Sequence, residues 1–215
     1  MAIGITRMAR RNAIIRKLPA VETLGSTTMI CSDKTGTLTK NEMTVKALYD
    51  GYDAFEVTGS GYDAEGDIFH EWETIDETSR DRLRTLLRIG LLCNESRMIV
   101  GDDGLRVDGD PTEGALIISA MKGGFDPEQE RNDHPMKGII PFESERGFMA
   151  SSHELGGRKF IYVKGASEKV VDMCSGLPSG EACNKQKILE TAGRFAGDGL
   201  RVLAMAYKEL DDAAD

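Results

Sequence analysis

The sequence has few cysteines and histidines, and neither type is arranged as a site. The four cysteines are scattered without a C-x-x-C pair, and the three histidines form no H-E-x-x-H motif. Disulfide scaffolds and zinc sites both depend on such close spacing. The sequence therefore argues against both and favours a reducing compartment.

Long apolar runs are also absent. The ten-residue stretch Thr23–Ser32 is among the longest without a charged side chain, whereas a membrane-spanning helix needs about 18 apolar residues or more. The first residues lack the apolar core and cleavage site of a signal peptide. A composition of 40% hydrophobic and 29% charged residues is that of a folded soluble protein, which argues against disordered or collagen-like chains. We therefore expect a globular chain without a membrane span of its own.

Positive charge is scarce and unevenly distributed. The net charge is −9, but residues 1–45 hold seven basic and three acidic groups. A net negative chain is a poor general nucleic-acid binder, because duplex affinity depends on neutralising phosphates. The asymmetry predicts two pieces with different surroundings. The basic run Arg7–Lys17 is typical of a solvated helix face, and the alternative is a segment near anionic lipid headgroups.

Local patterns predict a mixture of helices and strands over a length that suits one domain plus a piece of another. We expect a short basic helix over 7–18 that ends at Pro19, and a buried strand at Thr27–Ser32. Short glycine-interrupted strands follow between Thr44 and Ile68. The clearest helix is Asp76–Asn94, because its leucines recur three and four residues apart.

The second half of the chain predicts an antiparallel sheet with helices. Asp110 is placed to cap a helix that begins at Pro111, and Glu113 has the position of a capping-box acid. The strands expected are Lys137–Phe142, Gly147–Leu155, Arg158–Lys164 and Leu200–Tyr207, with helices at Ser167–Cys174 and Asn184–Phe195. Adjacent hairpin strands indicate an α+β fold over most of the chain.

One run of residues carries recognisable chemistry, the string D-K-T-G-T-L-T from Asp33 to Thr39. An aspartate at the end of a buried strand lies where open α/β sheets place ligands. Its carboxylate can attack a phosphoryl group and form an acyl phosphate. Gly36 allows a close backbone approach, while Lys34 and the hydroxyls of Thr35 and Thr37 can contact phosphate oxygens.

This string resembles the phosphorylation motif of the P-type ATPases, and the flanking residues Leu18–Ser26 resemble the type II cation pumps. The resemblance implies that Asp33, Lys34 and Thr35 are catalytic, and that Asp33 and Thr35 help to hold Mg²⁺. Related haloacid-dehalogenase-type phosphatases carry a second aspartate where this chain has Thr35. Because a threonine cannot take up and return a proton in the same way, the substitution favours an ATPase over a phosphatase.

Four later motifs are similar to nucleotide-domain motifs of the same family and follow in the family's order. They are Gly109–Leu116, Pro141–Arg146, Lys164–Ala166 and Gly199–Ala204. The resemblance implies an ATP site in which Phe142 stacks on adenine and Glu113 accepts a hydrogen bond from the adenine amino group. Base–aromatic stacking is worth about 1–3 kcal/mol. The implied nucleotide-binding residues are Thr112, Glu113, Phe142, Arg146, Lys164, Gly165, Arg201 and Leu203.

The resemblance also implies a domain division. Residues 1–43 are expected to be the first part of an α/β haloacid-dehalogenase-like phosphorylation domain. Residues 44–215 are expected to be the nucleotide-binding domain, an antiparallel sheet flanked by helices. The parent would be a pump that uses ATP and Mg²⁺ to move a cation, with this chain on the cytoplasmic side of the membrane.

The expected partners are ATP and the rest of the same pump: the second half of the phosphorylation domain, an actuator domain and transmembrane helices. No nucleic acid is expected. Because those parts do not occur before Asp215, we expect the chain to be a fragment. It also departs from many relatives at Gly147, where they carry a lysine after the arginine. That departure predicts a weaker nucleotide contact.

Two alternatives remain at this stage: a phosphatase with a large cap domain, and a nucleotide-binding module without chemistry. The transported ion is not identified, because the residues that coordinate it in this family lie in membrane helices. The kinship of Leu18–Ser26 favours a light monovalent or divalent cation over a soft transition metal.

Overall fold

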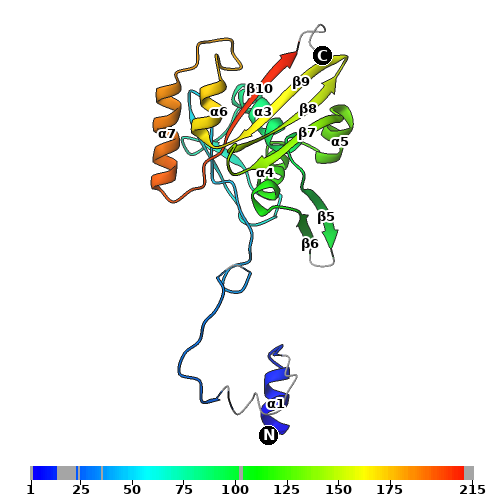
Figure 1. Cartoon of the computed structure of the whole chain (residues 1–215), viewed down its shortest axis with the longest axis vertical. Coiled ribbons are helices and arrows are strands. Elements are labelled where there is room, and N and C mark those ends of the chain that lie inside the picture. Colours follow the sequence, from blue (N-terminus) through cyan, green and yellow to red (C-terminus); the bar gives the residue numbers. More distant parts are fainter. Residues whose placement is uncertain (1, 14–22, 24, 35, 102–103, 211–215) are drawn as a thin grey trace. The chain divides into compact units, whose positions relative to one another are not determined.

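The computed structural model describes residues 2–13, 23, 25–34, 36–101 and 104–210. The chain divides into two compact units, Met1–Asn41 and Glu42–Asp215. Figure 1 shows the elements of each unit coloured along the sequence.

The first unit contains helix α1, Ala2–Ala9. The expected helix over 7–18 is therefore wrong for its described part, because the helical turns end before Asn12. Asn12 has a left-handed backbone with φ 60°, and its N–H donates to the Ala9 carbonyl at 3.0 Å while that of Ala13 donates to Met8 at 3.0 Å. This pair of bonds is the Schellman arrangement that stops a helix at an asparagine or glycine. Residues 14–18 and Pro19 lie outside the described residues.

The expected strand Thr27–Ser32 does not form. Its residues are irregular and exposed, with Met29 79% and Ile30 85% accessible. A buried parallel strand needs neighbouring strands to satisfy its backbone and cover its side chains. The described residues of this unit contain no strand that could pair with Thr27–Ser32. Its apolar sequence alone is therefore not enough to form a strand.

The second unit is built around an antiparallel sheet of four strands. They are β7 (Met136–Glu143), β8 (Phe148–Leu155), β9 (Arg158–Gly165) and β10 (Ala204–Leu210). Their order is β10-β9-β8-β7, as Figure 1 shows. The turn between β8 and β9 is Gly156-Gly157 with φ 56° and 79°, the left-handed pair that a two-residue hairpin requires. The structure thus confirms the expected antiparallel fold.

The remaining strands of this unit form two smaller sheets. The first comprises β1 (Ala47–Tyr49), β2 (Ala54–Val57), β3 (Ile68–His70) and β4 (Glu73–Thr74), in that order. The second is the hairpin of β5 (Arg97–Gly101) and β6 (Gly104–Asp108). All of these pairings are antiparallel.

The described residues of this unit form five helices: α3 (Glu77–Leu92), α4 (Pro111–Lys122), α5 (Pro127–Asp133), α6 (Ser167–Met173) and α7 (Lys185–Gly197). Asp76, Asp110, Asp126 and Asn184 cap four of them with side-chain oxygens that accept backbone N–H groups. Such caps are each worth about 1 kcal/mol. The helix starts predicted at Asp76 and Asp110 are confirmed.

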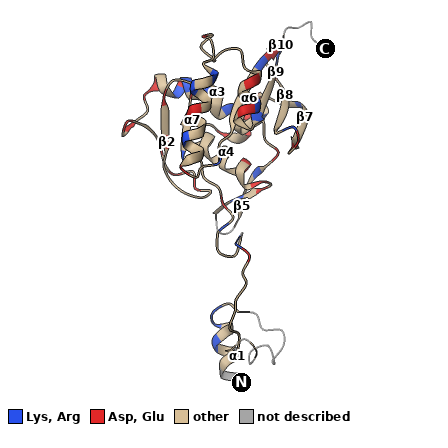
Figure 2. Cartoon of the chain, turned by 60° about the vertical axis from the view of Figure 1, so that its left-hand side comes forward, with Lys and Arg blue, Asp and Glu red and all other residues tan. Residues whose placement is uncertain are grey.

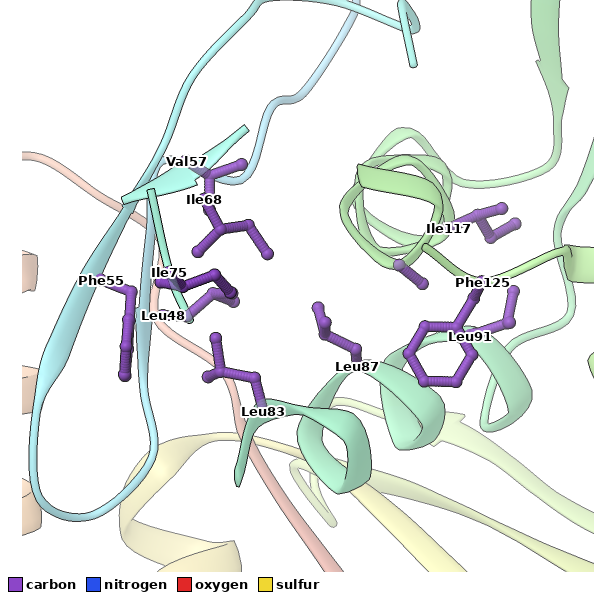
Figure 3. Packing of buried hydrophobic residues seen from close by; sticks show 11 residues of the cluster. Leu48, Phe55, Val57, Ile68, Ile75, Leu83, Leu87, Leu91, Ile117 and Phe125 are labelled. Atoms are coloured by element: carbon purple, nitrogen blue, oxygen red, sulfur yellow. The ribbon is translucent and has the colours of Figure 1, made fainter. Parts of the chain in front are cut away.

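Helix α3 joins two apolar clusters and so connects the sheets. One cluster packs Leu83, Leu87 and Leu91 of α3 against strands β1–β3 and helix α4 (Figure 3). The other packs Ile89, Leu92 and Cys93 against Met149, Phe160 and Tyr162 of the large sheet. Truncating a buried leucine in such a core costs about 2–5 kcal/mol. The position of the large sheet therefore depends on α3.

Strand β10 begins later than the sequence predicts. The expected strand was Leu200–Tyr207, but the structure has Ala204–Leu210. The N–H of Leu200 donates to the Phe195 carbonyl at 3.0 Å and that of Gly199 to Ala196 at 3.0 Å. Leu200 thus closes the end of α7, and Arg201 to Leu203 form an irregular link to the strand.

A buried histidine gives the fold a predictable pH dependence. His153 is 2% exposed, and its ring contacts the His134 carbonyl at 3.0 Å and the Ser151 hydroxyl at 2.8 Å. Burial lowers the pKa of His153. Because the unfolded chain then binds the proton more readily, stability is complete above a pH of about 6.5 and falls as the pH drops below it, by at most about 1.4 kcal/mol per pH unit.

The measurement is the free energy of unfolding of the parent chain and His153→Gln between pH 8 and pH 5, at constant salt. We expect the variant to lose less stability than the parent over this interval. If the two proteins lose the same free energy of unfolding between pH 8 and pH 5, His153 is not the source of the pH dependence.

Residues 26–34 and 36–40 are exposed and lie in turns or irregular segments of the first unit, so their backbone is open to a protease. Limited trypsin digestion should cleave at Lys34 or Lys40 before it cleaves within the paired strands β7–β9. Mass spectrometry of the first fragments, at two protein concentrations, measures this order. Equal protection of both regions at the lower concentration would show that the first unit is better ordered than its exposure indicates.

Candidate nucleotide site

The phosphorylation-motif residues lie in the first unit. Asp33 and Lys34 are exposed, and the carbonyl of Lys34 accepts the N–H groups of Leu38 at 3.0 Å and Thr39 at 3.2 Å. These bonds close a tight turn directly after the aspartate. Thr35 lies outside the described residues.

The residues expected to bind the nucleotide converge at one end of the large sheet. Gly165 ends β9 and pairs with Ala204 of β10 on one side and with Phe148 of β8 on the other. Leu203 directly precedes Ala204, and Arg146 lies in the turn before Phe148. Phe142 is next to the last residue of β7. Motifs up to 61 residues apart in sequence therefore meet at a single sheet edge.

Gly165 is required there by close packing. A Cβ atom on this residue would collide with the carbonyl oxygen of Gly147 and with the backbone of Phe148. The Gly147 carbonyl also accepts the N–H of Ala166 at 2.8 Å. The glycine following Lys164 thus lets the β7–β8 turn lie directly against β9.

The start of α4 supplies two more of the expected residues. Asp110 caps the helix by accepting the N–H groups of Thr112 at 2.7 Å and Glu113 at 3.3 Å. The Thr112 hydroxyl in turn accepts a hydrogen bond from Nη1 of Arg201 at 3.0 Å. Arg201 is exposed and makes no salt bridge with any described carboxylate. Its charge is therefore free to meet an anion.

A buried ion pair links α4 to the sheet. Nζ of Lys164 lies 2.7 Å from Oε1 of Glu113, and the two side chains are only 6% and 14% exposed. Lys164 shares one face of β9 with the buried residues Phe160 and Tyr162, as the period-2 pattern predicts. Instead of extending into solvent, the lysine turns inward to the carboxylate.

The expected capping-box role of Glu113 is wrong. The Asp110 N–H that such an acid would accept donates instead to the Ser96 hydroxyl at 2.9 Å. The second carboxylate oxygen of Glu113 accepts from the N–H groups of Glu95 and Ser96 at 3.0 Å each and from the Ser96 hydroxyl at 2.9 Å. The bond within the helix start, from the Asp110 N–H to Glu113, is therefore absent. Donors from the segment after α3 bind the Glu113 carboxylate instead.

Sequence analysis missed the residues that surround Glu113. Asn94 is 4% exposed, and its amide donates to the carbonyls of Gly90 and Glu113, at 3.0 Å each. Ser96 is 1% exposed and contacts the carboxylate itself. These residues follow α3 in a short polar run without a recognisable spacing, so only the fold reveals their position.

The end of β7, just before the turn to β8, presents the proposed stacking residue. Phe142 is 56% exposed. Nη1 of Arg146 donates to the Pro141 carbonyl at 2.9 Å, and Nη2 lies 2.6 Å from a Glu143 carboxylate oxygen. Gly147 has φ 76°, a conformation that a lysine adopts only with strain. A glycine in place of the lysine that many relatives carry here therefore fits the backbone of this turn.

Basic and acidic residues are interspersed over the second unit (Figure 2). The charge at the candidate site therefore comes from its individual side chains and not from a large surface patch of one sign. A cleft of about 1090 Å³ adjoins the site and is lined by residues of α3, α6, α7 and β10, together with Thr112, Arg201 and Leu203. Phe142, Glu113 and Lys164 do not line it. We place the candidate site at the sheet edge, because the polar groups converge there.

The described residues lack two further features. None of the described helices combines the length and apolar character that crossing a bilayer demands. Within the described ranges, no group of three or more His, Cys, Asp or Glu side chains is placed to hold a metal ion.

Comparison with known proteins agrees with the geometry. Residues 82–215 match the family model described as P-type ATPase, cytoplasmic domain N. The chain is 46% identical over 220 residues to a cation-transporting ATPase of Synechocystis, covering 98% of the chain and 24% of that protein. It is 36% identical to a calcium-transporting ATPase of Bacillus subtilis, with 98% of the chain and 24% of that protein covered.

A human relative, calcium-transporting ATPase type 2C member 1, is 38% identical over 218 residues, with 96% of the chain and 23% of that protein covered. The chain thus spans about a quarter of the length of these relatives. The family match covers more than half of the chain and the antiparallel sheet with its flanking helices. The chain therefore belongs to the P-type ATPase family and includes its cytoplasmic domain N.

Proposed function

We propose that the second unit binds ATP at the end of the large sheet where β9 is joined to the first turn of α4 by the Glu113–Lys164 pair. The convergence of the expected nucleotide residues supports this, and the Glu113–Lys164 pair carries it, because the pair fixes an acceptor and a cation side by side at 2.7 Å. The exposed ring of Phe142 offers the flat apolar surface that a purine needs. Arg201 offers a guanidinium to the phosphates.

The proposed orientation follows from the chemistry of these groups. The Glu113 carboxylate is an acceptor and suits the exocyclic amino group of adenine. Lys164 offsets part of the negative charge of the nucleotide. Arg146, Thr112, Gly165 and Leu203 are proposed to shape the pocket around the base and ribose. The family description supports this use of the domain, and the residue roles are our proposal.

For the parent protein, we propose that the γ-phosphate of ATP is transferred to Asp33 and that hydrolysis of the acyl phosphate drives a cation across a membrane. The nucleophile would be a carboxylate oxygen of Asp33, which displaces ADP from the γ-phosphorus. Lys34 and Thr35 are the proposed neighbours of the transferring group. The chain would lie on the cytoplasmic side, as the name of the family domain implies.

Magnesium fits this chain only in part. Asp33 offers the oxygen ligand type that Mg²⁺ prefers, and the other proposed ligand, Thr35, lies outside the described residues. The described residues hold no cluster of three or more metal-binding side chains. Our proposal for nucleotide binding in the second unit therefore does not depend on the ion.

The chain should bind ATP weakly without turning it over. Stacking and a few charge-assisted contacts predict a dissociation constant of about 0.1 mM to several mM, or about −4 to −5.5 kcal/mol. Most of this binding should survive removal of Mg²⁺. A titration of amide NMR shifts with ATP, in Mg²⁺ and in chelator, measures both, alongside incorporation of radiolabelled γ-phosphate.

Absence of nucleotide shifts at several millimolar would contradict the proposed site. Stable labelling that disappears in Asp33→Asn would show that the chain is itself competent for phosphorylation, which would overturn the expected lack of turnover.

Phe142→Ala should remove most adenine binding and leave the fold intact. The ring is 56% exposed, so its loss should change stability by less than about 0.5 kcal/mol. Phe160→Ala is the matched control, because that ring is 8% exposed and its removal should cost about 3–5 kcal/mol. Denaturation curves and ATP titrations of both variants test the assignment. A comparable loss of stability in Phe142→Ala would place the ring in the core.

A further inference from the structure

Ser96 is bonded through every polar atom it has. Its N–H donates to Asn94 at 2.9 Å and to Glu113 at 3.0 Å, and its carbonyl accepts from Nη2 of Arg131 at 2.7 Å. Its hydroxyl accepts the Asp110 N–H at 2.9 Å and donates to Glu113 at 2.9 Å. The side chain is 1% exposed. A serine held in this way has one orientation and one recipient for its proton.

The recipient is the Glu113 carboxylate. The hydroxyl also lies 3.5 Å from the Asp110 carbonyl, but the carboxylate is closer and charged, so it is the stronger acceptor. With two backbone N–H groups and this hydroxyl, Oε2 of Glu113 receives three donors. Its acceptor capacity is therefore used up.

The other oxygen, Oε1, accepts only from Lys164 among the described residues. A carboxylate oxygen has two lone pairs, so Oε1 keeps one for a further donor. The amino group at position 6 of adenine is such a donor. The carbonyl at position 6 of guanine is an acceptor and would meet the carboxylate with like partial charge.

We propose that Ser96 is a positioning residue that sets base selectivity at the ATP site. Its hydroxyl holds Oε2 of Glu113 and keeps Oε1 directed to Lys164 and to the base, so that the site accepts 6-amino purines and rejects 6-oxo purines. This inference rests on the proposed nucleotide site. Ser96 itself does not touch the nucleotide.

Ser96→Ala removes the hydroxyl and leaves both backbone donors to Oε2. The carboxylate is then held by two donors on Oε2 instead of three and rotates more freely. We expect ATP affinity to fall about three- to tenfold, the effect of one lost hydrogen bond of ordinary strength. GTP affinity should change less, so the ratio of the two dissociation constants should move toward one.

The matched control is Ser119→Ala. Ser119 is 3% exposed and lies in the same helix as Glu113, but its hydroxyl donates to the Leu116 carbonyl at 2.9 Å. It should leave the ATP-to-GTP ratio unchanged. A purely structural role of Ser96 would weaken both nucleotides alike. The ratio therefore separates positioning from stability.

Ser96→Cys guards against poor folding of the alanine variant, because a thiol fills the space of the hydroxyl and donates only weakly. The ¹³C shift of the Glu113 carboxyl carbon should differ from the parent in both Ser96 variants and match it in Ser119→Ala. The titrations follow NMR shifts with ATP and with GTP, without Mg²⁺.

A reduced ATP-to-GTP preference in Ser96→Ala and Ser96→Cys supports the inference. If the parent binds ATP and both variants keep its preference, the inference is wrong and the proposed function stands. If the parent chain binds no ATP, the proposed function fails and the inference fails with it.

Discussion

The ion pair between Glu113 and Lys164 is the constraint on which the site depends. It joins the first turn of α4 to the last residues of β9 across 51 positions of sequence. Two side chains that are 6% and 14% exposed lose most of their hydration, and further hydrogen-bond partners help to offset that cost. Glu113 has them in Ser96 and Glu95. Breaking one member would leave a buried charge unpaired.

The pair also explains why the surrounding backbone is so closely specified. Lys164 can reach Glu113 only if α4 begins beside the sheet, which its cap at Asp110 and the bond from Arg201 to Thr112 both support. Gly165 must stay small for the β7–β8 turn to approach. Leu92 and Cys93, at the end of helix α3, pack against the same face of the sheet. The contacts that stabilise this part of the fold thus also shape the proposed nucleotide site.

Much of the fold could be predicted from the sequence, because its signals are local. The cap at Asp110 and the hairpin turn at Gly156-Gly157 act over a few residues, and the structure has both. The strand expected at Thr27–Ser32 failed because a buried strand depends on neighbours that no local pattern supplies. In the described part of the range 7–18, the expected helix is wrong because the chain leaves the helix before Asn12. An asparagine is a weaker helix-stop signal in a sequence than a proline.

The site was predictable to the extent that its motifs are contiguous. Glu113 and Lys164 each belong to a recognisable string, but their contact is visible only in the folded chain. The partners of Glu113 were not predictable: Ser96 follows a helix end without any motif. Glu113 was also expected to accept the N–H of its own helix cap, but its carboxylate binds Glu95, Ser96 and Lys164 instead.

We propose that the nucleotide lies at the sheet edge and not in the adjoining apolar cleft. Intermolecular NOEs between the adenine protons of bound ATP and the protein distinguish the two positions. We expect NOEs to the ring of Phe142 and none to Ile188 or Phe195, which line the cleft. NOEs to Ile188 and Phe195 without any to Phe142 would contradict it.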